Sequence, residues 1–184
     1  CAPLGPGNKL IFATTAFSGM GLSCVNRLSA GSKSPLTGGI KEANSGGTLA
    51  TYMAYHGLRM IIIEGQPQEE GLWLLHINAA GEAMLRNARD YKGMNNYSLV
   101  ERLIREHGEN ISVASIGIAG ERKYRNSSIL ITEYGTNYPN RAAARGGMGA
   151  VMGSKGIKAV LIERPPKRYA PVYADKAAFY SLRR

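Results

Sequence analysis

Two arginines and a glycine pair lie close together in the stretch RAAARGGMGAVM, and their types and spacing suit anion binding. Arg141 and Arg145 precede Gly146 and Gly147, and an apolar helical pattern follows. A helix that begins after two glycines offers unpaired backbone N–H groups and the positive end of its dipole to a phosphate. The same glycines would also let the helix pack closely against a neighbouring element. The stretch itself leaves both interpretations open.

A second copy of this pattern lies one hundred residues earlier. The stretch ANSGGTLATYM at 43–53 corresponds to AARGGMGAVM at 143–152, and in both copies a glycine and an apolar strand pattern follow. Upstream, LIFATTAFSG resembles ISVASIGIAG, and an arginine comes soon after each of them. We therefore predict an internal repeat, with halves at about 8–65 and 110–163. Two equivalent glycine pairs would suit a ligand that carries two similar phosphate groups.

Each half reads as strand, loop, a second strand or loop, glycine pair, helix and strand. The runs LIFATTAF and ISVASIGI are apolar and β-branched and end at glycine, which is typical of buried strands. After Gly47, apolar residues recur with the spacing of one helix face, and Gly57 suits the end of that helix. After Gly147 the spacing repeats, with Gly156 at the end. The runs MIIIEG and AVLIER indicate the closing strands.

The segment between the halves has its own pattern. Residues 71–91 predict a hairpin that turns near Asn78 to Gly81. The run SLVERLIREH predicts an amphipathic helix over 98–107, with Ser98 as its N-cap. The proline-rich tail from Pro165 is typical of an extended exit to another domain.

Composition narrows the class of protein. The chain has 184 residues, 44% of them hydrophobic, and its apolar runs are too short to span a bilayer. The net charge of +10 is scattered, which argues against a nucleic-acid partner. Two cysteines, Cys1 and Cys24, are too few for a disulfide scaffold or a four-thiolate metal site, so we expect a reducing cytoplasm. Because the chain starts without Met and stops just inside a helix-like pattern, we expect it to be part of a longer polypeptide.

Other candidate residues do not form a recognisable catalytic group. His56, His76 and His107 are far apart in the sequence and lack carboxylate or thiol neighbours at ligand spacing, so we predict that they do not bind metal. Ser34 and Ser154 have no visible base partner. No phosphate-loop lysine motif or dinucleotide fingerprint occurs. The sequence therefore predicts an anion-binding domain with no catalytic residue of its own.

Four motifs resemble one known family in order and content. They cover the chain from about residue 8 to residue 163, and they are SKSPLTGGIKEANSGG (32–47), GLRMIIIEG (57–65), VASIGIAGE (113–121) and RAAARGGMGAVMGSKGIKAV (141–160). These motifs resemble the N-terminal domain of tungsten-containing aldehyde ferredoxin oxidoreductases. Two departures are visible: Ala144 stands where the family usually has glycine, and the loop FSGMGLSCVNR lacks a proline before its arginine.

The resemblance implies a fold and a cofactor. It implies an α+β domain of two β-sheets, related by a pseudo-twofold internal repeat and packed with helices. It implies a bis-pyranopterin cofactor with tungsten or molybdenum, in which each half holds one pterin and a magnesium ion bridges the phosphates. We expect this cofactor-binding domain over residues 1–163, and we expect 164–184 to be a linker and the start of a following domain.

The resemblance also assigns roles residue by residue. By motif position, Arg27 would lie between the pterin and a [4Fe-4S] cluster whose cysteine ligands come mainly from the following part of the protein. The backbone carbonyls of Asn44 and Ala142 would bind the magnesium ion. The full set of cofactor-binding residues implied in this way is Arg27, Asn44, Gly46, Arg141, Ala142, Ala144 and Arg145, with Gly146 adjacent.

The implied activity is oxidation of an aldehyde to a carboxylic acid, with electrons passing through the cluster to ferredoxin or to an iron–sulfur subunit. The remainder of the same polypeptide would complete the enzyme, a homodimer is compatible with the family, and these residues alone would be inactive. Two alternatives stay open. One is a relative that acts on hydroxy acids or aromatic acyl-CoA thioesters, and the other is a non-catalytic module that binds a phosphate ligand.

Overall fold

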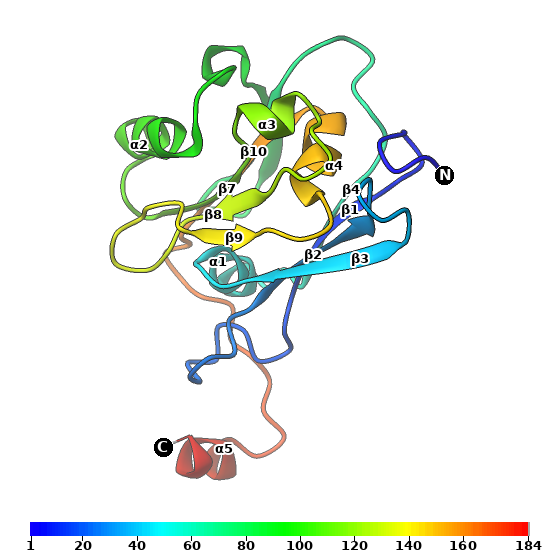
Figure 1. Ribbon diagram of the computed structural model, residues 1–184. Helices are drawn as coiled ribbons and strands as arrows, with labels where there is room; N and C mark the ends of the chain where they lie inside the picture. Colours follow the sequence, from blue (N-terminus) through cyan, green and yellow to red (C-terminus); the bar gives the residue numbers. More distant parts are fainter. Residues whose placement is uncertain (184) are drawn as a thin grey trace.

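The computed structural model describes residues 1–183, and two β-sheets form its centre (Figure 1). The first sheet has four antiparallel strands in the order β3-β2-β1-β4. Helix α1, Leu49–Tyr55, leads into the last of them. The strands are β1 (Leu10–Thr14), β2 (Leu28–Lys33), β3 (Ile40–Ser45) and β4 (Met60–Ile63).

The second sheet has six strands in the order β6-β5-β10-β7-β8-β9. Strands β5 and β10 are parallel, and the other neighbours are antiparallel. The strands are β5 (Trp73–Ile77), β6 (Ala83–Asn87), β7 (Ile111–Ser115), β8 (Ile129–Ile131), β9 (Arg141–Ala143) and β10 (Ile157–Glu163). The remaining helices are η1 (Arg89–Tyr91), α2 (Asn96–His107), α3 (Ile118–Glu121), α4 (Met148–Ser154) and α5 (Lys176–Leu182).

The strand orders show the internal repeat directly. Reading β9-β8-β7-β10 in the second sheet gives the same arrangement as β3-β2-β1-β4 in the first, and α4 precedes β10 as α1 precedes β4. Both helices end at a glycine with positive φ, Gly57 at 73° and Gly156 at 68°. The predicted α+β fold with two sheets from a repeat is therefore confirmed. The hairpin β5–β6 extends the second sheet beyond the repeated unit.

The elements between the halves match the prediction except at one cap. The hairpin turns where Asn78 N donates to the Glu82 carbonyl at 3.0 Å, as expected. The N-cap of α2 is Asn95, whose side chain accepts from Ser98 N at 2.9 Å, so the prediction of Ser98 as cap was wrong. An asparagine is as good an acceptor as a serine at this position, and its use starts the helix two residues earlier.

The core lies where the sheets and the two repeat helices meet. All seven residues of α4 are buried, whereas α1 leaves Tyr52 and Tyr55 half-buried. The largest buried apolar side chains of this cluster include Leu10, Phe12, Leu28, Leu49, Met53, Ile116 and Ile129. A second cluster holds α2 against the outer face of β7 and β10 through Leu99, Val100, Leu103, Val113 and Leu161.

The C-terminal tail leaves this body. Residues 164–175 form no helix or strand, and α5 buries none of its residues, standing apart from the sheets in Figure 1. Residue 184 lies outside the described residues. The assignment of 1–163 to one domain and 164–184 to a linker and a following domain stays a prediction. Within residues 1–183, none of the helices has the length and apolar character needed to cross a bilayer.

Candidate cofactor-binding site

The two glycine pairs are packing sites. Gly47 has a φ of 99°, and a Cβ there would lie 2.6 Å from the Thr132 carbonyl oxygen. Gly147 has a φ of 73°, and its Cβ would lie 2.0 Å from the Arg125 carbonyl oxygen. Only glycine has both the conformational freedom and the missing side chain that these positions require. The close-packing interpretation is therefore confirmed in both copies.

The helix starts themselves are not open to a ligand. In the first copy, Thr48 N donates to Thr132 O at 2.9 Å, and in the second, Gly149 N donates to Ser127 O at 3.0 Å. The first residues of both helices, Leu49 and Met148, are fully buried. The sequence left anion binding and close packing both open, and neighbouring loops already supply an acceptor for one N–H group at each helix start.

The exposed polar residues lie in the strands just before the glycine pairs. Asn44 is exposed near the end of β3, and Arg141 and Ala142 are exposed in β9. A Cβ built on Gly46 would lie 3.8 Å from Arg141 Cδ, and one on Gly146 would lie 2.6 Å from the Cγ atom of a lysine in β3. Strand β3 and the segment 141–146 therefore run side by side in opposite directions (Figure 1).

The backbone carbonyl of Asn44 points to the open edge of the first sheet. Lys33 turns both its N–H and its C=O away from β3, toward the Asn8 side chain at 3.2 and 3.0 Å. Because bonding direction alternates along an antiparallel strand, Ser29 turns the same way. Asn44 lies opposite Ser29 in the register, so it makes no backbone bond with β2. Its carbonyl must face outward from β3, the edge strand.

The same reasoning places the Ala142 carbonyl. Thr132 N donates to Val113 O at 3.0 Å, so Leu130, two residues earlier, also bonds to β7 rather than to β9. Ala142 lies opposite Leu130 in the register of β8 and β9. Its carbonyl therefore points away from β8, toward the free side of β9. Strand β9 is an edge strand of the second sheet. The two carbonyls predicted to bind magnesium lie on edges that face each other.

Positive charge gathers around these two edges. Arg27 is exposed and directly precedes Leu28, which pairs with Ser45, so the register places Arg27 across from Gly46. Arg145 is also exposed. Within residues 1–183, Arg141 forms one ion pair, from its Nε to Glu133 Oε2 at 3.2 Å.

Neighbouring side chains favour the charged form of Glu133, which pairs with Arg141. The pKa of its carboxyl group is lowered first by hydrogen bonds from the Asn140 amide and the Thr136 hydroxyl, and then by the Arg141 charge. The side chain of Arg141 is 57% exposed, so its guanidinium keeps donors free for an anion. The candidate cofactor-binding residues are thus gathered at one place, with Ala144 exposed between β9 and α4.

The structure also gathers residues that the sequence analysis kept apart. His76 and His107 both contact the carboxylate of Glu163, and the His56 ring lies 2.8 Å from the Glu163 carbonyl oxygen. His76 and His107 therefore have a carboxylate neighbour in space that their spacing in the sequence did not indicate, whereas His56 contacts only the main chain. The parallel pairing of β5 with β10 brings His76 to Glu163, and no motif in the sequence signals that pairing.

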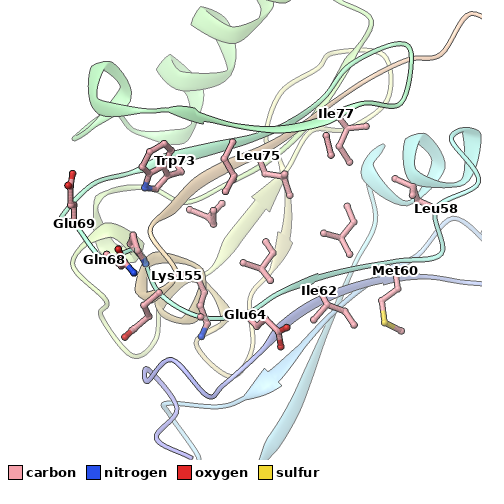
Figure 2. A pocket seen from close by; sticks show the side chains of 18 of the residues that line it. Leu58, Met60, Ile62, Glu64, Gln68, Glu69, Trp73, Leu75, Ile77 and Lys155 are labelled. Atoms are coloured by element: carbon pink, nitrogen blue, oxygen red, sulfur yellow. The ribbon is translucent and has the colours of Figure 1, made fainter.

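An apolar cavity lies elsewhere and contains none of the predicted site residues. It has a volume of about 930 Å³ and lies between β4 and the hairpin β5–β6 (Figure 2). Its walls are mainly apolar, and they include the half-exposed side chains of Met60, Ile62 and Leu85. This cavity is a groove between the two sheets, distinct from the edges of β3 and β9.

Comparison with known proteins decides the family. A family model described as the N-terminal domain of aldehyde ferredoxin oxidoreductase matches residues 1–164. The chain belongs to this aldehyde ferredoxin oxidoreductase family. Within the family, the chain is 38% identical over 182 residues to a tungsten-containing aldehyde ferredoxin oxidoreductase of Pyrococcus horikoshii. That alignment covers 98% of this chain and 28% of the relative.

Other relatives differ in the activity that their names state. A tungsten-containing aldehyde ferredoxin oxidoreductase of Pyrococcus furiosus is 37% identical, and the match covers 96% of this chain and 27% of that protein. The WOR-like subunit of an aliphatic sulfonate oxidoreductase from the same organism is 30% identical, with 86% and 26% covered. The chain therefore spans little more than a quarter of the length of these curated relatives.

A solved structure has the same fold. The active-site complex BamBC of benzoyl coenzyme A reductase, with bound 1,5-dienoyl-CoA, superposes with a TM-score of 0.82 at 32% sequence identity. The alignment covers 91% of this chain and 24% of that one. The fold is thus common to family members whose names state different substrates.

Proposed function

We propose that this chain is the cofactor-binding domain of an oxidoreductase that converts aldehydes to carboxylic acids at a tungsten or molybdenum bis-pyranopterin centre. One observation carries the proposal. The repeat places two outward-facing carbonyls, Asn44 and Ala142, on facing strand edges with arginines beside them. The tungsten-containing relatives at 35–38% identity support the choice of metal.

The facing edges fit a magnesium-bridged pair of phosphates. Magnesium prefers oxygen ligands, and the carbonyls of Asn44 and Ala142 supply such oxygens without adding negative charge next to a phosphate. Arg141 and Arg145 would donate to phosphate oxygens, and a guanidinium does so through two N–H groups at once. At the same edges Gly46 has no side chain and Ala144 has only a methyl group, which leaves their backbone accessible to the pterin rings.

Arg27 would hold the pterin on its cluster side. Its charge is permanent, and a fixed positive charge favours the more negative, reduced state of a nearby [4Fe-4S] cluster. Because the chain has only Cys1 and Cys24, most cluster ligands would come from the remainder of the polypeptide. The 184 residues alone are therefore expected to be inactive.

The bound metal would supply the redox chemistry, taking two electrons from the aldehyde, while the protein binds, orients and tunes it. The electrons would leave singly through the cluster to ferredoxin or to an iron–sulfur subunit. The residues described above act on that process through binding and charge. We assign none of them a role in proton transfer to the substrate.

A second activity is favoured by one comparison. The fold match at 32% identity to a benzoyl coenzyme A reductase complex makes reduction of aromatic acyl-CoA thioesters the main alternative. The purified protein, assayed with aldehydes and an artificial electron acceptor and then with an aromatic acyl-CoA and a reductant, distinguishes the two. A relative acting on hydroxy acids would respond to neither assay.

Metal and pterin analysis tests the proposal most directly. The purified protein should contain tungsten or molybdenum together with fluorescent pterin oxidation products. Arg141→Ala should retain both poorly, because a charge-assisted hydrogen bond contributes about 1.5–3 kcal/mol, roughly tenfold or more in affinity. Arg105→Ala, an exposed arginine on α2, is the matched control and should retain both fully.

Two results would count against the assignment. If the protein carries neither metal nor pterin, the non-catalytic phosphate-binding module is the better description. If Arg141→Ala and Arg105→Ala retain equal amounts of both, Arg141 does not hold the cofactor. Arg141→Lys should fall between the two, since lysine keeps the charge and loses the paired donors.

A further inference from the structure

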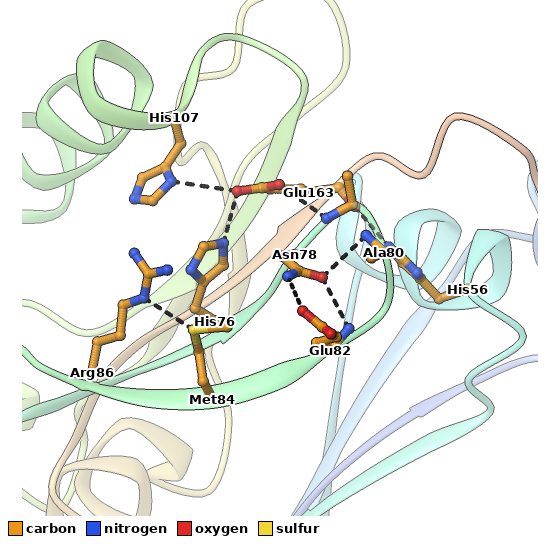
Figure 3. Close-up of polar contacts among 10 residues, drawn as sticks. His56, His76, Asn78, Ala80, Glu82, Met84, Arg86, His107 and Glu163 are labelled. Carbon is orange, nitrogen blue, oxygen red and sulfur yellow. Dashed lines mark hydrogen bonds and ion pairs between the residues drawn. The ribbon is translucent and has the colours of Figure 1, made fainter.

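Two histidines and a glutamate from three different elements meet at one end of the second sheet (Figure 3). His76 Nε2 lies 2.8 Å and His107 Nδ1 lies 3.4 Å from Glu163 Oε1. The ligand atoms of all three residues fall within 4.8 Å of one another. His76 is 2% exposed, whereas the side chains of His107 and Glu163 are 13% and 24% exposed. The cluster is thus nearly enclosed, with one side open to solvent.

The fold fixes these three residues relative to one another. In the register of β5 and β10, His76 lies opposite Leu161, two residues before Glu163. Glu163 in turn lies opposite Ile111, the first residue of β7. Helix α2 ends at His107, and Gly108, with a φ of 81°, turns the chain back toward β7. Regular elements hold all three side chains, which suits a site that needs defined geometry.

Further contacts orient the glutamate. Ala79 N donates to Glu163 Oε2 at 2.9 Å, which leaves Oε1 for the histidines. The His56 ring lies 2.8 Å from the Glu163 backbone oxygen, and it holds the main chain rather than the carboxylate. The C-terminal end of α2 adds partial negative charge beside His107. Outer contacts of this kind are the ones that orient the ligands of metal sites.

We propose that His76, His107 and Glu163 form a binding site for a divalent transition-metal ion, with zinc the best fit. Two imidazoles and one carboxylate are ligands that zinc accepts, and three protein ligands leave a fourth position for water. The exposed side of His107 and Glu163 provides that position. The ion would join the ends of α2 and β10 to β5. This site is separate from the strand edges proposed to hold the pterin cofactor.

Arg86 gives the site a recognisable electrostatic signature. Its side chain is exposed, its Nε contacts Met84 Sδ at 3.2 Å, and Figure 3 shows its guanidinium beside the two histidine rings. A positive charge at this place opposes a bound cation. Removing it should therefore strengthen metal binding, the opposite of the effect of removing a ligand.

Titration of the metal-free full chain tests the site. Zinc binding followed by calorimetry should saturate at one ion per chain, and cobalt should give the ligand-field bands of a four-coordinate site. His107→Gln and Glu163→Gln should weaken zinc binding by more than about 100-fold, because outer contacts alone typically change metal affinity 10- to 100-fold. Arg86→Gln should bind zinc several-fold more tightly. Zinc binding should also weaken as the solution is made acidic, because protons compete with the metal for the imidazole and carboxylate ligands.

His56→Gln is the matched control, since it removes a histidine that touches the same glutamate without facing its carboxylate. It should bind zinc like the unaltered chain. Circular dichroism in the presence of a chelator checks that each variant is folded. His76 is the more deeply buried histidine, so if His76→Gln does not fold, the test relies on His107→Gln. The proposal is overturned if zinc fails to bind at about 1 mM, an affinity too weak for a specific site. It is equally overturned if His107→Gln binds as tightly as His56→Gln, since the three residues then form only a hydrogen-bonded cluster.

Discussion

The two halves of the repeat share a strand order but not an environment. Helix α4 of the second half is buried on every side, while α1 of the first half keeps two tyrosines half-exposed. Lys158 in β10 is fully buried, whereas Arg59, at the corresponding place before β4, is exposed. The difference arises because α3 packs against α4, while Glu121 of α3 and the loop before α2 enclose the Lys158 side chain. A repeated pattern therefore fixes topology, and the flanking elements decide burial.

The comparison also explains where the candidate cofactor site lies. Asn44 belongs to the first half, Arg141 and Ala142 belong to the second, and they meet because β3 and β9 are the corresponding edge strands of the two sheets. Neither half has the full set of charges. At corresponding positions, the first half has Asn44 and the second half has Ala144. The arginines before the glycine pair occur only in the second half.

The largest effect is expected at the glycine pairs. Gly147→Ala places a methyl group 2.0 Å from a backbone carbonyl oxygen at a φ of 73°, so the neighbouring chain must move. We expect a loss of more than about 4 kcal/mol, which for most domains means failure to fold. Gly47→Ala, at 2.6 Å, should also be severe but less so. Thermal unfolding measures the ranking.

Gly46→Ala is the control for this series. Its nearest neighbour would be 3.8 Å away, and it lacks the positive φ of the others, so the free energy of unfolding should change by less than about 1 kcal/mol. If Gly46→Ala destabilises the protein as much as Gly147→Ala, close packing is not the reason for the glycine pair in the second half.

The next effect separates Lys158 from Arg59. Lys158 Nζ donates to the carbonyls of Met94 and Ile116 at 2.8 and 2.9 Å and pairs with Glu121. Burial lowers the pKa of Lys158, although Glu121 opposes this shift. Lys158→Met leaves Glu121 without its partner, and such losses cost about 3–5 kcal/mol.

Arg59→Met is the corresponding change in the first half. The Arg59 side chain is exposed, and it donates to the Thr15 carbonyl at 3.1 Å. Arg59→Met should therefore lower the free energy of unfolding by less than about 1 kcal/mol. Denaturant unfolding of both variants gives the comparison. Equal losses would mean that the two halves do not differ in burial in solution. Adding Glu121→Gln to Lys158→Met should recover part of the loss, because the remaining charge is removed.

The sequence predicted the repeat because topology depends on patterns that survive divergence. The glycine pairs, the apolar strand patterns and the glycines that end the helices recur with similar spacing. The helices and strands of each half, and their order, could therefore be predicted. The hydrogen bonds at the two helix starts could not be predicted, because their acceptors, at Ser127 and Thr132, lie in loops with no recurring signal. The outward carbonyls of Asn44 and Ala142 depend on bonding alternation, which needs a register that only the structure gives.

The histidine cluster was missed for a related reason. These three residues, His76, His107 and Glu163, are separated by dozens of residues, so they do not form a ligand pattern within one helix or strand. Their meeting depends on the parallel pairing of β5 with β10, outside the repeated unit. The repeat predicts only pairings between elements that occur in both halves. Strand β5 occurs once, so its pairing with β10 could not be predicted by comparing the two halves.

A moderate effect should distinguish the starts of the two repeat helices. Thr48 Oγ1 lies 2.7 Å from Ser112 Oγ and 2.8 Å from Thr132 Oγ1, all of them buried, whereas the second helix begins with an apolar methionine. Thr48→Val leaves two buried hydroxyl groups short of a partner and should cost about 1–3 kcal/mol. Thr37→Val, on an exposed turn, should change the unfolding free energy by less than about 0.5 kcal/mol. Similar losses in both variants would show that the network contributes nothing specific.

The smallest effect concerns the segment that covers only the second half. Burial and a hydrogen bond to Glu106 raise the pKa of Tyr91, which precedes α2, from 10.0 to about 12. Between pH 10 and pH 12 the folded protein therefore keeps the Tyr91 proton, whereas the unfolded chain has lost it. The stability that Tyr91 contributes is present below pH 10 and is lost as pH rises through about 12. Ultraviolet titration should show a component near pH 12 that Tyr91→Phe removes and Tyr124→Phe leaves intact. At neutral pH, Tyr91→Phe should cost less than about 1 kcal/mol, since water still reaches the pair. A component near pH 12 that keeps its full size in Tyr91→Phe would mean that α2 is not held against the second half by this contact.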